Sequence, residues 1–394
     1  MIEKNFKDID RIIVMSLAPL NKTLIEAIFL NIFIELGIKI EFWSLTKVLT
    51  GVEYNEEICV YQDSEINIRH IKNREHLKLS LSEINTDNTL INVQIYFESR
   101  FYWFFKMLTR SDLIYFVSIV GVMPSVSLTE RSQQLSHSPK LFLKKGYLKL
   151  MKIIVSKFEL IKKPEFAFVA GSIAEKISSS KKNISVNSRD YDHVSFSNKH
   201  NDLKFNDGRK YIVYIDQGVG RHPDDAIINK KVNEKLDQYY IKLNLFFDTL
   251  EKLNNMKIIV ASHPRIKNNF QFGHRAIIKD KTLDLISGAE FVLAQCSTAI
   301  SFAIMKKKPI LFFFSDYMRE GEEMDSLIYS SIKALSNELG CNLINIDYYQ
   351  EHTLIFKKDS KLYSQYKYQY LTSTATENLS NYEIMSDIFV KNKR

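Results

Sequence analysis

Two short polar loops in the second half of the chain carry residue types that could do chemistry. One is Ala261-Ser262-His263-Pro264-Arg265, and the other is Gln295-Cys296-Ser297-Thr298. Each follows an apolar run typical of a strand, at residues 257–260 and 291–294. Because ligands bind outside the carboxyl ends of strands in open parallel sheets, we expect the two loops to form one site. Their hydrogen-bond donors suit an anion, and above all a phosphate.

The pairs His263-Pro264 and Ser297-Thr298 in these loops can each also be explained by a structural role that needs no ligand. Pro264 restricts His263 to an extended backbone, from which the imidazole can donate to a phosphate oxygen. A turn with a satisfied histidine is the other interpretation. Ser297 and Thr298 can cap the helix that follows, and the same position offers unpaired backbone N–H groups that bind anions well. Taken together, the two pairs favour phosphate binding.

A third loop supplies a carboxylate at another strand end. Asp216-Gln217-Gly218-Val219-Gly220 continues to Arg221-His222-Pro223-Asp224 after a strand at 209–215. The glycines let the backbone pass close to a ligand, and Asp216 could act as a general base toward an incoming hydroxyl. The structural alternative is a turn-forming Asp with a local backbone hydrogen bond. Pro223 takes the place of a third glycine, so the Gly-x-Gly is not a dinucleotide fingerprint.

The elements that would position these loops alternate between strand and helix. In the first half we predict a strand at 11–17, a helix at 23–36, strands at 38–42, 90–97 and 164–171, and a helix at 100–108. In the second half we predict strands at 209–215, 257–261, 291–295 and, as the last one, 309–314, with helices at 232–253, 282–287 and 297–306. The polar stretch 178–207 is interpreted as loops and a linker. This βαβ alternation predicts α/β domains with parallel sheets.

Length and composition favour two globular domains without metal or disulfide scaffolds. The chain has 394 residues, 45% of them hydrophobic and 25% charged, which is too long for one ordinary core. Its 3 cysteines are far apart and form no CxxC pair, as expected in a reducing cytoplasm. The N-terminus lacks the apolar region of a signal peptide. Glu26 and Glu35 interrupt the apolar segment 24–42, so we predict a buried helix and a strand rather than a membrane span.

The net charge of +8 is spread over scattered lysine pairs. With no dense basic block and no nucleic-acid motif, we expect no nucleic-acid partner. Such pairs are usually solvated faces. Their functional alternative is weak attraction to anionic headgroups at the inner face of the cytoplasmic membrane. We therefore expect a cytoplasmic protein that can contact that membrane peripherally.

The three loops together resemble the motif set of bacterial sialyltransferases with the GT-B fold, which use CMP-activated sugars. The run 214–316 is also similar to proteins of capsule and O-antigen clusters believed to transfer nonulosonic acids. The resemblance implies two Rossmann-like domains facing a central cleft. It implies an acceptor-binding domain at 1–205 and a nucleotide-sugar domain at 206–394, with the C-terminal residues packing back on the first domain.

In those sialyltransferases the acidic motif supplies the base, and this role falls on Asp216. The motif has one acid here, next to Gln217 and Gly218, where some relatives have two. His222 and Asp224 therefore remain alternative bases or acceptor contacts.

The phosphate-binding roles fall on His263, Ser297 and Thr298. Arg265, beside Pro264, and Lys279 could add positive charge, although either could equally be a surface residue. These donors would stabilise the charge that develops on the leaving CMP, and closure of the cleft would exclude water.

The resemblance implies transfer of sialic, legionaminic or pseudaminic acid, or of Kdo, to a surface polysaccharide. The acceptor hydroxyl would belong to a glycan or a lipid-linked oligosaccharide of a capsule, O-antigen or lipooligosaccharide. CMP-sugar is then a co-substrate, and no cofactor or metal is expected. Asp190-Tyr191-Asp192-His193 could chelate a divalent metal, but we expect it in a polar loop with a structural or acceptor-side role.

Two other functions remain open. A glycosyltransferase or epimerase using a UDP-sugar would share the two-domain architecture. A non-catalytic polysaccharide-binding protein would need none of the proposed chemistry. Cys296 lies beside Ser297, but we interpret it as a small buried residue rather than a nucleophile.

Overall fold

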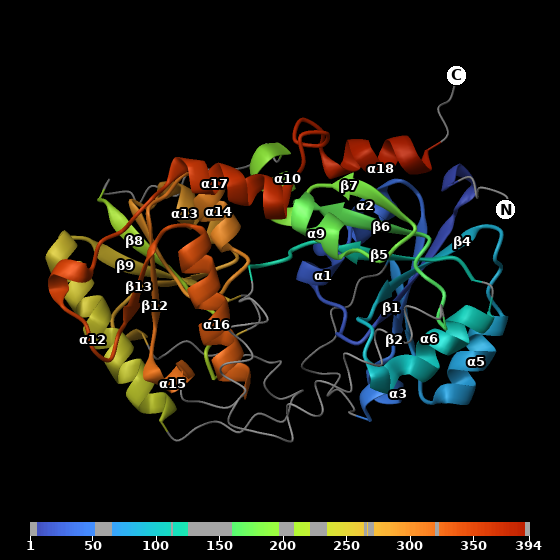
Figure 1. Cartoon of the computed structure of the whole chain (residues 1–394), viewed down its shortest axis with the longest axis horizontal. Helices are drawn as coiled ribbons and strands as arrows, with labels where there is room; N and C mark the ends of the chain where they lie inside the picture. The colour runs from blue at the N-terminus through green and yellow to red at the C-terminus, as the bar shows by residue number, and fades with distance from the viewer. Residues whose placement is uncertain are drawn as a thin grey trace. The chain divides into compact units, whose positions relative to one another are not determined.

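The computed structural model describes residues 6–51, 65–111, 113–124, 160–196, 209–220, 235–263, 266, 272–319 and 323–390. The chain forms two compact units (Figure 1). The first contains the described residues up to 122, those from 160 to 189, and those from 372 onward. The second contains the described residues between 190 and 371. Within the described residues, no helix combines the length and apolar character needed to cross a bilayer.

The first unit is built on a parallel sheet of seven strands in the order β3-β2-β1-β4-β5-β6-β7. The strands are β1 (Arg11–Ser16), β2 (Lys39–Ser44), β3 (Ile66–His70), β4 (Thr89–Gln94), β5 (Tyr115–Ile119), β6 (Phe166–Ala170) and β7 (Lys182–Val186). Central strands such as β1 and β6 are nearly continuous apolar runs because both of their faces are buried.

Helices cover both faces of this sheet. One core contains side chains of α1 (Lys22–Ala27), α2 (Leu30–Glu35) and α18 (Asn381–Phe389). The other contains side chains of α3 (Thr46–Thr50), α5 (Arg74–Ser82) and α6 (Tyr102–Arg110). The remaining helical elements are η1 (Phe6–Asp8), η2 (Ser99–Phe101) and α9 (Gly171–Ile177). The unit is therefore a three-layer α/β domain.

The predicted continuous helix at 23–36 is wrong, because the chain breaks between α1 and α2. Phe29 has a φ of 66°, in the left-handed region. Ile28, Phe29, Leu30 and Phe33 are all buried, and Phe29 meets Phe168 edge-on. A straight helix places such closely spaced residues on different sides, and the break turns them all toward the sheet. The predicted burial of this segment is confirmed.

The chain's C-terminal segment belongs to the first unit. Asn187, at the end of β7, donates to the carbonyls of Thr376 (3.2 Å) and Leu379 (2.7 Å). It also accepts from the hydroxyl of Thr372 at 2.5 Å. The backbone of Asn187 exchanges hydrogen bonds with the side chain of Asn381. One buried amide thus fixes the returning chain, and α18 then packs on α2 with Phe389 against Phe33.

The second unit contains a parallel sheet of six strands in the order β10-β9-β8-β11-β12-β13. The strands are β8 (Tyr211–Ile215), β9 (Lys257–Ser262), β10 (Ile277–Lys279), β11 (Phe291–Ala294), β12 (Ile310–Phe314) and β13 (Asn342–Asn345). Its helical elements are α10 (Arg189–Phe196), α12 (Leu236–Asn254), α13 (Thr282–Gly288), α14 (Ile300–Met305), α15 (Asp316–Arg319), α16 (Glu323–Glu338), η4 (Glu351–Thr353), α17 (Ser360–Tyr366) and η5 (Lys367–Leu371). Two Rossmann-like sheets, as the resemblance implied, are confirmed.

The long helix α12 shows why the apolar spacing was informative. Leu236, Tyr239, Leu243, Phe246 and Leu250 are buried, as the spacing predicts. Leu253, predicted on the same face, is 48% exposed because it lies in the last turn. Phe246 and Phe247 pack against Phe313 of β12.

Several short elements depart from the predictions. Strand β7 lies in the stretch 178–207, which was predicted as loops and a linker, and its exposed first residues leave little apolar signal. Strand 309–314 is not the last, because Asn342–Asn345 adds β13 at the edge, where its polar ends are tolerated. Strand β10 has only three residues and leaves little periodic signal.

Residues 189–196, predicted as loop, form helix α10. The described residues from 190 to 371 belong to the second unit. The predicted boundary between 205 and 206 falls outside the described residues. Helix α10 contacts the second unit through Tyr191, which lies under Lys367, and through His193, whose ring is 6.4 Å from Phe302. Its N-terminal Asp190 and Asp192 favour a helix because carboxylates stabilise a first turn.

Candidate functional site

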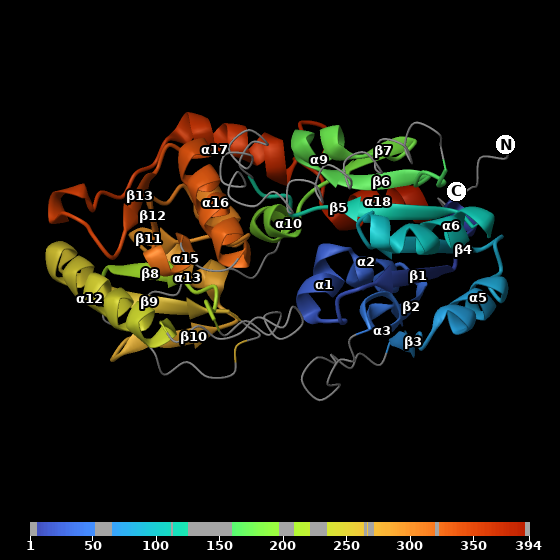
Figure 2. The same ribbon diagram turned by 60° about the horizontal axis from the view of Figure 1, so that its bottom comes forward.

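The predicted loops follow three adjacent strands of the second sheet. Strand β8 pairs with β9 on one side and with β11 on the other. The chain builds outward from β8 to β9 and β10 and then returns to place β11 beside β8 (Figure 2). The carboxyl ends of β8 and β11 therefore flank a topological switch point, where open α/β sheets bind ligands. Asp216, His263 and Gln295 are the first residues after β8, β9 and β11.

Asp216 occupies a tight turn directly after β8. Its side chain is 3% exposed, and its Oδ1 accepts from the N–H of Gly218 at 2.8 Å. Its own N–H donates to the carbonyl of Ala261, which ties the end of β8 to β9. The hydrogen bond expected of a turn-forming Asp is thus present, and it holds the carboxylate of Asp216 in one orientation. Gln217 is half-buried beside it.

The glycines of this turn are required by the backbone. Gly218 and Gly220 each have a φ of 67°, which side chains with a Cβ rarely adopt. A Cβ on Gly220 would also lie 2.7 Å from Leu236. The hydroxyl of Tyr240 donates to the carbonyl of Val219 at 2.9 Å. Helix α12 therefore packs against this turn through Leu236 and Tyr240.

A buried polar network joins the two strand ends at the switch point. Gln295 accepts from the hydroxyl of Tyr214 at 3.3 Å and donates to the hydroxyl of Tyr239 at 3.1 Å. Burial raises the pKa of Tyr239 well above its ordinary value, and nearby Tyr240 and the charge of Asp216 raise it further. The hydrogen bond with Gln295 lowers the pKa, but by less. Tyr239 therefore stays a neutral hydrogen-bonding group.

The sequence alone does not predict this network. Its only signal was the polar hydroxyl of Tyr239 among Leu and Phe on the buried face of α12. A buried hydroxyl needs a partner.

His263 lies directly after β9 and is half-buried. Its carbonyl accepts from the N–H of Ile266 at 3.1 Å, which closes a turn. Lys279 lies opposite Ser262 in the register of β10 and β9, and its ammonium donates to the carbonyl of Ile266. Lys279 thus holds the loop that carries His263, so any phosphate would meet a cation already engaged with backbone.

The segment after β11 forms a tight turn before α14. Ser297 Oγ accepts from the N–H of Ala299 at 3.3 Å, which caps the turn before α14, whereas α14 itself has no side-chain cap. Carbonyls of Ser297 and Thr298 accept from residues three positions ahead, so 3₁₀-type bonding precedes the six-residue helix α14. The predicted start at Ser297 is three residues early. Thr298 is exposed, which suits contact with a ligand.

Cys296 does not have the properties of a nucleophile. Burial raises the pKa of its thiol to about 11, opposed by a hydrogen bond with Ser331. Since the thiolate is the reactive form, the thiol is inert near neutral pH. Cys296 is half-buried, so the prediction of a buried residue is wrong, whereas the raised pKa favours the prediction that it is not a nucleophile.

Four predicted residues lie outside the described residues: Pro264, Arg265, His222 and Asp224. Asp190 and Asp192 were expected in a polar loop and lie instead in the first turn of α10. Across the described ranges, no group of three or more His, Cys, Asp or Glu side chains is placed to hold a metal ion.

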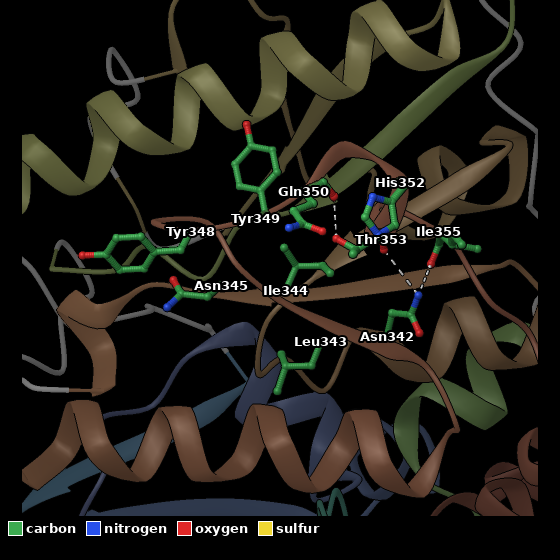
Figure 3. Close-up of a pocket in the computed structure, with 10 residues that line it drawn as sticks. All are labelled: Asn342, Leu343, Ile344, Asn345, Tyr348, Tyr349, Gln350, His352, Thr353 and Ile355. Carbon is green, nitrogen blue, oxygen red and sulfur yellow. Dashed lines mark hydrogen bonds between the residues drawn. The ribbon is translucent and has the colours of Figure 1, made fainter.

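A separate pocket of about 870 Å³ lies along the edge strand β13 (Figure 3). Its lining residues are Asn342, Leu343, Ile344, Asn345, Tyr348, Tyr349, Gln350, His352, Thr353 and Ile355. Tyr349 is anchored on α12 through Thr249 and Phe246, whereas Tyr348 is 75% exposed. None of the predicted site residues lines this pocket. Its amides and phenols suit a polar ligand such as a sugar.

Comparison with known proteins yields likeness in structure alone. No protein-family model and no curated protein matches the sequence. UDP-GlcNAc 2-epimerase from Methanocaldococcus jannaschii shares 12% identity over 90% of this chain and 97% of that one, with a TM-score of 0.41. The wall teichoic acid polymerase TagF shares 12% over 98% and 91%, with a TM-score of 0.46. The spinosyn forosaminyltransferase SpnP shares 10% over 96% and 95%, with a TM-score of 0.42.

Proposed function

We propose that the carboxyl edge of the second sheet binds a nucleotide-activated sugar and that the chain is a glycosyltransferase. The observation that carries this proposal is the placement of Asp216, His263 and the segment 295–298 at the ends of β8, β9 and β11. Neighbouring strands are about 4.8 Å apart, so the groups after β9 and β11 are separated by roughly 10 Å across β8. That span suits a phosphate and the sugar attached to it.

The chemistry divides among these groups. Asp216 takes the proton of an acceptor hydroxyl, whose oxygen forms the new bond to the anomeric carbon. The bond from that carbon to the phosphate oxygen breaks, and the nucleotide leaves with the electron pair. His263 and the Ser297–Thr298 turn donate to the phosphate, where the negative charge grows. Donors fixed in advance at such a position are usually the largest catalytic contribution.

We propose a CMP-activated nonulosonic acid as the donor and a surface-polysaccharide hydroxyl as the acceptor. Support comes from the resemblance of the three loops to those of bacterial sialyltransferases. A uridine nucleotide would fit the same strand ends equally well. A non-catalytic polysaccharide-binding role is favoured by one observation, the sugar-sized pocket along β13 with its exposed Tyr348.

Thermal denaturation of the full chain with CMP, CDP, UMP and UDP separates these functions. A nucleotide present at a hundred times its Kd adds about 2.7 kcal/mol, which corresponds to a rise in Tm of about 5–10 °C for a domain of this size. Stabilisation by the cytidine nucleotides supports the proposal. Stabilisation by uridine nucleotides alone refutes the CMP donor, and the absence of any shift favours the binding protein.

Two matched histidine variants locate the bound nucleotide. His263→Gln should remove most of the thermal shift. His352→Gln, in the pocket along β13, should leave the shift unchanged. The opposite pattern would assign the nucleotide to the β13 pocket. Mass spectrometry of CMP-sugars with a panel of acceptor glycans then identifies the product.

A further inference from the structure

Helices α5 and α6 of the first unit line a pocket of about 660 Å³. Figures 1 and 2 both show the two helices side by side at one end of this unit. Its lining residues are Arg74, Lys78, Leu81, Ser82, Ile84, Thr86, Trp103, Lys106, Met107, Arg110, Ser111 and Leu113. Four of these side chains are cations, and none is a carboxylate. We call this feature the α5–α6 pocket.

Helical spacing places the four cations around the pocket. On α5, Arg74 and Lys78 are one turn apart, and on α6, Lys106 and Arg110 have the same spacing. Residues four apart lie on the same helix face. The opposite faces of both helices are buried in the core of the unit. Two helices that pack on one core therefore each contribute two cations to the lining of the α5–α6 pocket.

Among the residues that the structure describes, no carboxylate lines the α5–α6 pocket beside the four cations. None of the four cations forms an ion pair with a carboxylate of the described residues. Of the neighbouring acids, Glu83 pairs with Arg69 and Glu98 with Arg100. Glu75, beside Arg74 in the first turn of α5, is exposed and is not among the lining residues. Cations that line one pocket repel one another, so an anion in the α5–α6 pocket would relieve that repulsion.

The floor of the α5–α6 pocket is apolar. Trp103 is half-buried, and the guanidinium of Arg74 lies 4.2 Å from its ring centroid. Met107 and Ile84 are half-buried beside Leu81, which is buried. Leu79, next to Lys78 on α5, is 60% exposed. Cations surround the apolar floor on the same small surface.

We propose that the α5–α6 pocket docks this protein on a bilayer that contains anionic phospholipid. The phosphodiester lies between the four cations, and Trp103 and Met107 lie at the boundary between headgroup and acyl chain. Tryptophan favours that depth because one end of its ring system is apolar and the other can donate. Clusters of four or more Lys and Arg on amphipathic helices are typical of anionic-lipid binding.

The composition favours a lipid over a nucleic acid. Trp103 is the one aromatic side chain in the lining, and Arg74 already covers its ring. Single-stranded nucleic acids need exposed rings on which successive bases stack. The docking surface lies on the first unit, whereas the proposed donor site lies on the second. Failure of one proposal therefore leaves the other standing.

Flotation of the full-length protein with lipid vesicles tests the proposal. We expect binding to vesicles of phosphatidylcholine mixed with phosphatidylglycerol and little binding to phosphatidylcholine alone. The triple variant Lys78→Ala, Lys106→Ala, Arg110→Ala should bind about a hundredfold more weakly, because each cation near an anionic surface contributes several-fold. A matched triple variant removes the same charge elsewhere through Lys252→Ala, Lys257→Ala and Lys361→Ala, and it should bind like the wild type. Equal losses in both triple variants would show that net charge alone is responsible and would overturn the proposal.

Fluorescence gives a second measurement that does not depend on the lysine variants. The chain has 2 tryptophans, and Trp43 is fully buried. Quenching by brominated phosphatidylglycerol should therefore report on Trp103, and Trp103→Phe should abolish it. Inorganic phosphate, glycerol phosphate and a short single-stranded oligonucleotide are the competitors. Efficient competition by any of them at low concentration would assign the α5–α6 pocket to a soluble anion or nucleic acid and contradict membrane docking.

Discussion

The two sheets of this protein share a strand order but differ in the chemistry at their carboxyl edges. In each sheet the first strand is an inner strand. Later strands are added first on one side of it and then on the other, so the order switches between β1 and β4 and between β8 and β11. At the first switch point, β1 leads into Leu17-Ala18-Pro19 and β4 into Ile95-Tyr96-Phe97. At the second, β8 leads into Asp216 and β11 into Gln295-Cys296-Ser297.

Polar groups at the first edge are used by the chain's own backbone. Ser16 exchanges hydrogen bonds with the backbone of Ala18, and Thr46 donates to the carbonyl of Leu17 at 2.6 Å. Asn187 holds the returning C-terminal segment. Asp216 and Ser297 at the second edge also accept from the local backbone. The second edge differs in placing a carboxylate, an imidazole and hydroxyls after three adjacent strands. Two sheets of similar topology thus carry different side chains at their carboxyl edges. Function has to be argued from those side chains rather than from the fold.

Asp216→Asn should produce the largest effect. Loss of a general base should lower the transfer rate by about 10²–10⁴-fold, while the amide oxygen can still accept from Gly218 and preserve the turn. Transfer assays should show this loss in kcat with an unchanged Tm. Asp237→Asn, the same change on the exposed face of α12, is the matched control. Full activity of Asp216→Asn would reduce this residue to a turn former and move the base to His222 or Asp224.

Asn187→Ala tests the structural role of the first edge. Its side chain makes three hydrogen bonds in a fully buried site, and each contributes about 1 kcal/mol. We expect the free energy of unfolding to fall by about 3 kcal/mol, measured by urea denaturation at neutral pH. The matched control is Asn85→Ala in an exposed loop. Similar losses in both variants would mean that the amide network does not fix the C-terminal segment.

The sequence predicted the strands of both sheets best where burial is complete. Strand β8 and strand β12 are continuous apolar runs with every residue buried, so their ends, and Asp216 with them, were placed correctly. Helix α10 was missed because its mostly polar and charged sequence has one buried residue, Tyr191. The network of Tyr214, Tyr239 and Gln295 could not be predicted, because it depends on a contact between residues distant in sequence.

Ser297→Ala separates a cap from a ligand contact. Loss of one hydrogen bond to a charged phosphate should lower kcat/KM about tenfold, whereas loss of the cap to Ala299 should lower stability by about 1 kcal/mol. Ser297→Thr keeps the hydroxyl and should rescue both. Thr298→Ala, at an exposed position, should affect transfer alone. A change in stability without any change in kcat/KM would limit Ser297 to capping and weaken the contrast between the two edges.

Replacement of Asp347 should give the smallest effect on stability and none on transfer. It tests whether an acid at the second edge other than Asp216 takes part in the reaction. This carboxylate, which follows β13, accepts from Ser315 at 2.7 Å and from the N–H of Asp316 at 2.6 Å. It also accepts from the ammonium of Lys242 at 2.5 Å. Burial alone would raise the pKa of Asp347, but the hydrogen bonds from Lys242, Asp316 and Ser315 outweigh it and lower the pKa.

A carboxyl whose pKa is lower in the folded than in the unfolded state stabilises the protein above the unfolded pKa, which is about 3.9 for Asp. That contribution is lost as pH falls through the folded pKa. Asp347→Asn should therefore cost about 1 kcal/mol at neutral pH, and the difference from wild type should vanish in acid. Urea denaturation across that pH range measures it, and transfer activity should stay unchanged because this acid is committed to holding β12, β13 and α12 together. If Asp347→Asn lost transfer activity while keeping its stability, the active site would have to extend from β8, β9 and β11 to the end of β13.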